Sequence, residues 1–134
     1  MKAKGSGFAG CSALCVDNEV LVALDSEWIL KSLGFGHVYA AFSFQDASFV
    51  IDQQKFDFAL LDIDLGGGRT SIGLARRLLK KGTAVVFASG HTYTLPTAEA
   101  LGLQVLRKPL ELSDVKAALA AMAGHCRMEA SPAG

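Results

Sequence analysis

The sequence predicts an α/β protein built on a doubly wound parallel sheet of five strands. Two observations lead to this class: short runs that are almost continuously apolar, and longer segments of helical period that alternate with them. Strands covered by helices on both faces leave few positions for polar side chains, so such runs are typical of a parallel sheet. The 134 residues contain neither an internal repeat nor an interdomain linker, and we therefore expect one domain.

Five apolar runs are the expected strands. Each has only four or five residues, which is an ordinary strand length and is short for a buried helix. They are ALCV at 13–16, HVYA at 37–40, FALL at 58–61, AVVFA at 84–88 and LQVL at 103–106.

The segments between and after these runs carry the expected helices. Residues 20–33 have a broad apolar face and stop before a glycine, a common helix terminator. Residues 71–80 repeat apolar side chains at helical spacing and end in lysines, which suit the negative end of the helix dipole. Residues 112–122 form a third apolar stripe. Weaker candidates lie at about 43–53 and 95–101, and the second carries a proline near its start.

Composition limits the function classes. Thirteen basic and thirteen acidic residues give a formal charge of zero, and they are mixed along the chain, so nothing indicates a nucleic-acid or membrane partner. The N-terminus reaches an acidic cluster before any long apolar stretch develops, which argues against a signal peptide or membrane span there. We therefore expect a cytoplasmic protein. Cys11, Cys15 and Cys126 are odd in number and lack metal-type spacing with histidine, so we expect reduced, small apolar residues.

Polar residues directly follow four of the expected strands. In an open parallel sheet the carboxyl ends of the strands lie at one edge, and ligand sites form there near the point where strand order reverses. We therefore expect one site that gathers these side chains. They are Asp17, Asn18 and Glu19 after the first strand, Asp62 at the end of the third, Ser89 at the end of the fourth, and Lys108 with Pro109 after the fifth.

The stretch ALLDIDLGGG at 59–68 indicates phosphoryl chemistry at this edge. The Asp62 carboxylate can attack phosphorus when a divalent metal offsets the negative charge of both groups. We expect Mg²⁺, held by Asp62, Asp17 and a backbone carbonyl in the 62–64 loop, because this hard ion prefers oxygen ligands and keeps several waters. The glycines that follow leave room for the backbone to approach the bound group.

Two further residues suit the phosphoryl oxygens. Lys108 would supply a compact positive charge, and the Ser89 hydroxyl would donate a hydrogen bond. The sequence therefore predicts a nucleophile, a metal site and an anion-binding pair at one edge of the sheet.

Four segments resemble the receiver domains of bacterial two-component response regulators. The resemblance covers nearly the whole chain and implies a flavodoxin-like (βα)5 fold with strand order 2-1-3-4-5, in a receiver domain at 10–124 with flexible termini at 1–9 and 125–134. More narrowly, the third and fourth strands are similar to single-domain receivers of alphaproteobacteria that carry Phe-Ala-Thr-Gly, with Ser89 in place of the threonine. The four segments are LCVDNE at 14–19, FALLDIDL at 58–65, AVVFASG at 84–90 and VLRKPL at 105–110.

The resemblance implies a role for each residue of the predicted site. A histidine kinase or histidine phosphotransfer protein would donate a phosphoryl group to Asp62, and a downstream protein would respond to it. Ser89 would be the switch hydroxyl and Lys108 the phosphate-sensing cation. Asp17 and Asn18, with Asp62 and the backbone carbonyl of Asp64, would hold the metal. Such a protein catalyses its own phosphorylation and dephosphorylation and is not a conventional enzyme.

Further positions of the family pattern also match this chain. Pro109 follows the lysine, where the family commonly has a cis peptide bond. Asp64 and His91 stand where the family tunes the lifetime of the phosphoryl group. Too few residues follow position 122 for an effector, so we expect output by protein contact through 90–102 and the last strand and helix, or action as a phosphate sink.

Two departures from the pattern keep other functions open. Asn18 lacks the negative charge of the usual second acid, so magnesium affinity should fall, and we do not expect Glu19 to replace it because adjacent residues point differently. Val105 stands where many receivers have an aromatic switch residue. The alternative is a degenerate receiver that binds a partner without phosphorylation. A haloacid-dehalogenase-type phosphatase is a weaker match, because its Asp-x-Asp pair normally closes the first strand.

Overall fold

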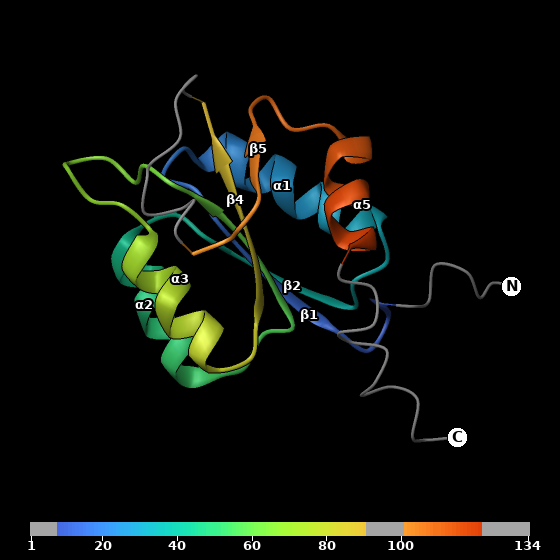
Figure 1. Ribbon diagram of the computed structural model, residues 1–134, viewed down its shortest axis with the longest axis horizontal. Coiled ribbons are helices and arrows are strands. Elements are labelled where there is room, and N and C mark those ends of the chain that lie inside the picture. Colours follow the sequence, from blue (N-terminus) through green and yellow to red (C-terminus); the bar gives the residue numbers. More distant parts are fainter. Residues whose placement is uncertain (1–7, 91–100, 122–134) are drawn as a thin grey trace, which may run out of the picture.

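The computed structural model describes residues 8–90 and 101–121. Its five strands form one parallel sheet in the order β2-β1-β3-β4-β5, which confirms the predicted class and strand order. Helices cover both faces of this sheet: α2 and α3 lie on one side, and α1 and α5 lie on the other (Figure 1). The strands are β1 (Ser12–Val16), β2 (His37–Ala41), β3 (Phe58–Asp62), β4 (Ala84–Ser89) and β5 (Val105–Arg107).

The helices of the described segments begin and end within two residues of the predicted bounds. They are α1 (Val20–Ser32), α2 (Phe44–Gln53), α3 (Ile72–Lys80) and α5 (Leu112–Ala120). The helix expected at 95–101 lies, except for its last residue, outside the described residues, and so do most of the expected flexible termini. No helix in 8–90 or 101–121 combines the length and apolarity that crossing a membrane requires.

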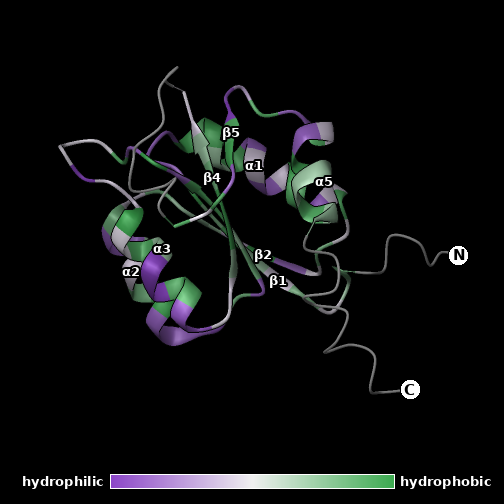
Figure 2. Cartoon of the chain, viewed as in Figure 1, coloured by the Kyte–Doolittle hydropathy of each residue, from purple (hydrophilic) through white to green (hydrophobic). Residues whose placement is uncertain are grey.

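Alternate side chains of the central strand β3 enter two separate cores. Ala59 and Leu61 pack in the core under α2 and α3, whereas Phe58 and Leu60 pack in the core under α1 and α5. Because successive side chains of a strand point to opposite faces, a strand covered on both sides must be apolar throughout. The central strands are accordingly mostly green, the colour of hydrophobic residues, in Figure 2. This burial explains why the strand runs stood out in the sequence.

The helices α2 and α3 are joined by polar contacts at their outer surfaces. Arg77 of α3 donates to the Ser48 hydroxyl at 2.7 Å and pairs with Asp52 at 2.8 Å, both on α2. Lys81, just after α3, donates to the backbone carbonyl of Ile51. These contacts fix one helix pair against its face of the sheet, although exposed pairs of this kind each contribute little to stability.

The cysteines differ from the expectation at one position. Cys11 takes part in a disulfide bond, so the cysteine pattern does not support the expected reducing compartment; spacing alone does not reveal such pairing. Cys15 is a free, buried thiol. Burial raises the pKa of Cys15 to about 12, with smaller contributions from the negative charges of Glu27 and Asp17. This thiol is therefore a small apolar core group, as predicted.

The weakly predicted helix α2 has a well-defined first turn. Ser43 precedes the helix in an extended conformation, and its hydroxyl accepts a hydrogen bond from the Asp46 amide at 3.0 Å. We expect Ser43→Ala to lower the free energy of unfolding by about 1 kcal/mol, because this amide then loses its partner. Urea denaturation checks the change. Ser113→Ala is the control, since this exposed serine lies inside the first turn of α5 and not at its cap; equal losses in both variants would contradict the capping role.

Candidate functional site

The register of the sheet brings Asp17 and Asp62 to the same place. Strands β1 and β3 pair with Val16 beside Leu61, so the next residues, Asp17 and Asp62, leave the sheet next to each other. The residues two positions earlier, Cys15 and Leu60, share the core under α1 and α5. Because side chains alternate along a strand, Asp17 and Asp62 belong to that same face. Two carboxylates thus lie together at the carboxyl edge of the sheet.

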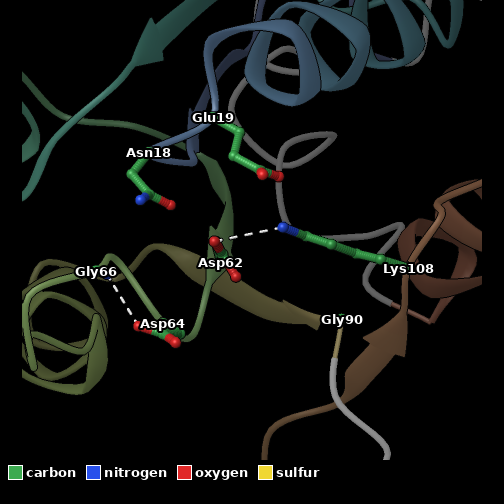
Figure 3. Close-up of a pocket in the computed structure, with 7 residues that line it drawn as sticks. All are labelled: Asn18, Glu19, Asp62, Asp64, Gly66, Gly90 and Lys108. Carbon is green, nitrogen blue, oxygen red and sulfur yellow. Dashed lines mark hydrogen bonds and ion pairs between the residues drawn. The ribbon is translucent and has the colours of Figure 1, made fainter.

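Asp62 is the more central of the two acids. Its strand β3 lies between β1 and β4, and the following amide, that of Ile63, donates to the Ala88 carbonyl at 3.0 Å. The Asp62 side chain is only 9% exposed. It reaches a pocket of about 350 Å³ whose wall comes from four separate loops (Figure 3). The lining residues are Asn18, Glu19, Asp62, Asp64, Gly66, Gly90 and Lys108.

Lys108 connects the two carboxylates. Its Nζ lies 2.5 Å from Asp17 Oδ2 and 3.3 Å from Asp62 Oδ2, and the Lys108 side chain is 15% exposed. The backbone holds this lysine in place, because its amide donates to the Ser89 carbonyl at 2.9 Å. The Lys108–Pro109 peptide bond is cis. One ammonium group therefore forms ion pairs with two carboxylates that follow or end different strands.

These contacts shift the proton affinities of the pair. Burial, together with the negative charge of Asp17, raises the pKa of Asp62 to about 6, although Lys108 acts in the opposite direction. Burial by itself would lower the pKa of Lys108, but the hydrogen bond to Asp17 and the charges of Asp62 and Asp17 raise it. The lysine therefore stays charged, while Asp62 is a carboxylate that is poorly solvated and only partly neutralised.

Asp17 also orders the start of α1. Its Oδ1 accepts a hydrogen bond from the Glu19 amide at 2.9 Å, while Oδ2 contacts Lys108. This turn places the side chains of Asn18 and Glu19 on the pocket wall. The amide oxygen of Asn18 points toward Asp62 (Figure 3).

The loop between β3 and α3 closes another side of the pocket. Asp64 Oδ1 accepts from the Gly66 amide at 2.9 Å, and a bridge joins Asp64 to Thr70. Residues 66–68 all have positive φ, at 86°, 61° and 80°. Only glycine adopts this backbone without strain, which explains the loss of side chains after the buried strand.

No protein-family model matches this sequence, and no curated protein matches it. Several solved structures do. A response regulator receiver domain (CheY-like) from Methylobacillus flagellatus has a TM-score of 0.73 at 23% identity, over 84% of this chain and 98% of that one. A CheY-like receiver domain protein from Methanospirillum hungatei has 0.75 at 20% identity, over 89% and 98%. A response regulator from Burkholderia pseudomallei has 0.72 at 21% identity, over 93% and 75%. This chain has the receiver-domain fold.

Within the receiver fold, most of the residues singled out in the sequence come together. Asn18, Asp62, Asp64 and Lys108 line one pocket, and Asp17 contacts Lys108 beside it. Ser89 ends β4 and is buried, but its neighbour Gly90 is the residue that lines the pocket. His91 lies outside the described residues. Glu19 also lines the pocket, as expected for a polar residue that follows the first strand, although no chemical role was expected for it.

The donor set fits a hard divalent cation that takes mixed oxygen ligands. Among the described residues, no group of three or more His, Cys, Asp or Glu side chains is arranged as a metal cluster. The two carboxylates of Asp17 and Asp62 nevertheless share one cation, the Lys108 ammonium, so this position favours positive charge. Together with the Asn18 amide oxygen, which faces Asp62 (Figure 3), these carboxylates are oxygen donors of the kind that Mg²⁺ binds together with water.

The raised pKa of Asp62 predicts a pH-dependent gain of stability in Asp62→Asn. The folded state holds the Asp62 proton more tightly than the unfolded chain does, so stability is lost as the pH rises from about 4 through 6. Removing this charge should therefore raise the free energy of unfolding by roughly 1–3 kcal/mol above pH 7 and change it little near pH 4.

Urea denaturation in EDTA between pH 4 and 8 measures this difference. Asp25→Asn is the control, because this exposed acid on α1 should give no pH-dependent gain. A constant difference between parent and Asp62→Asn across this range would show that Asp62 is not destabilised by ionisation.

Proposed function

We propose that this chain is a receiver that accepts a phosphoryl group on Asp62 from the phosphohistidine of a histidine kinase or phosphotransfer protein. The observation that carries the proposal is the placement of the Asp62 carboxylate in an open pocket, 3.3 Å from the Lys108 ammonium and beside Asp17. A nucleophile and a cation that meet the same incoming phosphate are the parts that phosphoryl transfer requires.

Transfer would exchange one bond for another at phosphorus. An oxygen of the ionised Asp62 carboxylate forms a P–O bond, the P–N bond of the donor phosphohistidine breaks, and the departing imidazole nitrogen takes a proton from solvent. Lys108 then pairs with phosphoryl oxygens, and the Ser89 hydroxyl donates to one of them. A bound Mg²⁺ would supply the charge that lets two anions approach.

Two chain segments would hold this metal. Asp17, Asn18, Asp62 and the backbone carbonyl of Asp64 are the proposed ligands. The response regulator from Burkholderia pseudomallei, which shares this fold, carries a phosphorylated aspartic acid and a calcium ion, which supports a metal beside the acceptor here. The neutral Asn18 would make magnesium binding weaker than a second aspartate would.

The narrower resemblance and the cellular role are also part of this proposal. Phe87-Ala88-Ser89-Gly90 closes β4, in line with the Phe-Ala-Thr-Gly subgroup, and Ser89 keeps the hydroxyl. The response would pass to a downstream protein by contact, or the chain would act as a phosphate sink. Both roles would be carried out in the cytoplasm beside the kinase, although the Cys11 disulfide does not support a reducing compartment. Neither role needs nucleic acid or a membrane.

A phosphorylation-independent binding module is the second candidate. Lys108 already serves both carboxylates in the structure, and Asn18 adds no negative charge for a metal. Val105 packs against the core under α2 and α3, and as an aliphatic residue it has no ring that could act as an aromatic switch. These features favour a chain that keeps one conformation and binds its partner in it.

A phosphatase of the haloacid dehalogenase type has less support. Such an enzyme needs the second acid of the Asp-x-Asp pair as a proton donor beside the nucleophile. Here Asp64 Oδ1 accepts from the Gly66 amide within its own loop (Figure 3). Asp64 is therefore engaged in shaping the loop.

Phosphorylation is tested by intact-mass measurement of the protein with Mg²⁺ and a small acyl-phosphate donor. We expect an adduct of about 80 Da, one phosphoryl group, that is absent in Asp62→Ala and in EDTA. Asp25→Ala is the matched control and should carry the adduct, because this acid is exposed on α1.

The alternatives give different results in the same measurement. The absence of an adduct at high Mg²⁺, with none formed by a phosphorylated phosphotransfer protein either, contradicts the proposal and favours the binding module. Steady release of phosphate from a small phosphate ester would instead indicate the phosphatase.

A further inference from the structure

The side chain of Asn18 lies directly on the backbone of Gly66. A Cβ atom added to Gly66 would stand 2.9 Å from Asn18 Nδ2 and 3.8 Å from Asn18 Cγ. The first distance is shorter than real Cβ contacts, so no other residue fits there without moving Asn18. The same side chain turns its amide oxygen toward Asp62 (Figure 3).

Gly66 itself is held in a fixed position. Its amide donates to Asp64 Oδ1 at 2.9 Å, and its carbonyl accepts from the Arg69 amide at 3.0 Å. The Arg69 guanidinium lies 4.4 Å from the centre of the Phe44 ring, which anchors the far side of the loop. These contacts hold Gly66 in its loop at the place where Asn18 packs on it.

The neighbouring glycines make no such contact. Gly67 and Gly68 share the positive φ of Gly66, at 61° and 80°, but an added Cβ would meet nothing within 4 Å at either position. The loop thus has three glycines with the same backbone requirement, and among them only Gly66 touches a residue of the pocket. The shared positive φ therefore explains why all three positions are glycine, but it does not explain the contact that Gly66 alone of the three makes with Asn18.

We propose that Gly66 is a positioning residue that orients Asn18 and thereby sets the metal affinity of the pocket. The inference rests on the proposed function, in which Asn18 is a metal ligand. A neutral amide is attracted to a cation much less than a carboxylate is, and only its oxygen can bind one. Packing must therefore turn this oxygen toward the metal, and the bare backbone of Gly66 supplies the space.

The test compares Gly66→Ala with Gly67→Ala. Both variants place a Cβ at positive φ, so both should lower the melting temperature of the metal-free protein by a similar amount. Only Gly66→Ala displaces Asn18. With Mn²⁺ alone as the probe, followed by electron paramagnetic resonance of the free ion, we expect Gly66→Ala to bind about tenfold more weakly than Gly67→Ala.

The same pair is then measured in an Asn18→Ala background. We expect Asn18→Ala to weaken Mn²⁺ binding and to remove the difference between the two glycine variants. Equal affinities of Gly66→Ala and Gly67→Ala with Asn18 present would overturn the inference, and so would an unchanged affinity in Asn18→Ala.

Failure of the inference is distinguishable from failure of the proposed function. If the parent binds Mn²⁺ and Asp62→Ala weakens that binding, the metal site stands whatever the glycine variants do. If the folded parent binds no Mn²⁺, the metal step of the proposed function and this inference both fail. If Gly66→Ala does not fold, Asn18→Gln replaces it in the test. The longer glutamine side chain keeps the amide oxygen but cannot pack on Gly66 in the same way. An Mn²⁺ affinity equal to that of the parent would then overturn the inference.

Discussion

The pairing of Lys108 with Asp17 and Asp62 is the interaction on which the site depends. Two carboxylates at the edge of one sheet repel each other, and both are largely removed from water. A single ammonium at 2.5 Å and 3.3 Å offsets part of that repulsion. The pKa of Asp62 is nevertheless raised, because burial and the charge of Asp17 outweigh the effect of Lys108. The negative charge of the two carboxylates is therefore only partly neutralised, and the pocket favours a further positive charge. A metal-assisted phosphoacceptor would use this property to bind a cation, and a binding module would use it to bind a basic group of its partner.

The backbone pairing of the sheet determines where these three side chains lie. Parallel pairing aligns the carboxyl ends of β1, β3, β4 and β5, and the register puts Asp17 beside Asp62. Lys108 arrives from β5, two strands away from β3, and its backbone bond to Ser89 holds it beside β4. A change that slid one strand by a single residue would turn its acid to the other face of the sheet. The precision of the site is thus a consequence of strand pairing.

The loop after β3 contributes space and orientation. Its three glycines adopt a backbone that other residues avoid, and its internal hydrogen bonds engage Asp64 with Gly66. Asn18, from the turn after β1, packs against Gly66 of this loop. Segments almost fifty residues apart in the chain therefore define one wall together. In the proposed metal site, a neutral asparagine would depend on its orientation more than an aspartate would.

The sequence by itself determined the sheet, the order of its elements and the clustering of Asp17, Asp62 and Lys108. Those features follow from short-range physics: apolar runs report burial on both faces, and polar residues at strand ends must meet at one edge. Only the tertiary structure decided which oxygen Lys108 contacts, that Asn18 packs on Gly66 and that Cys11 enters a disulfide. These are contacts between segments distant in the chain, and they depend on distances and side-chain directions that no local pattern of residues encodes.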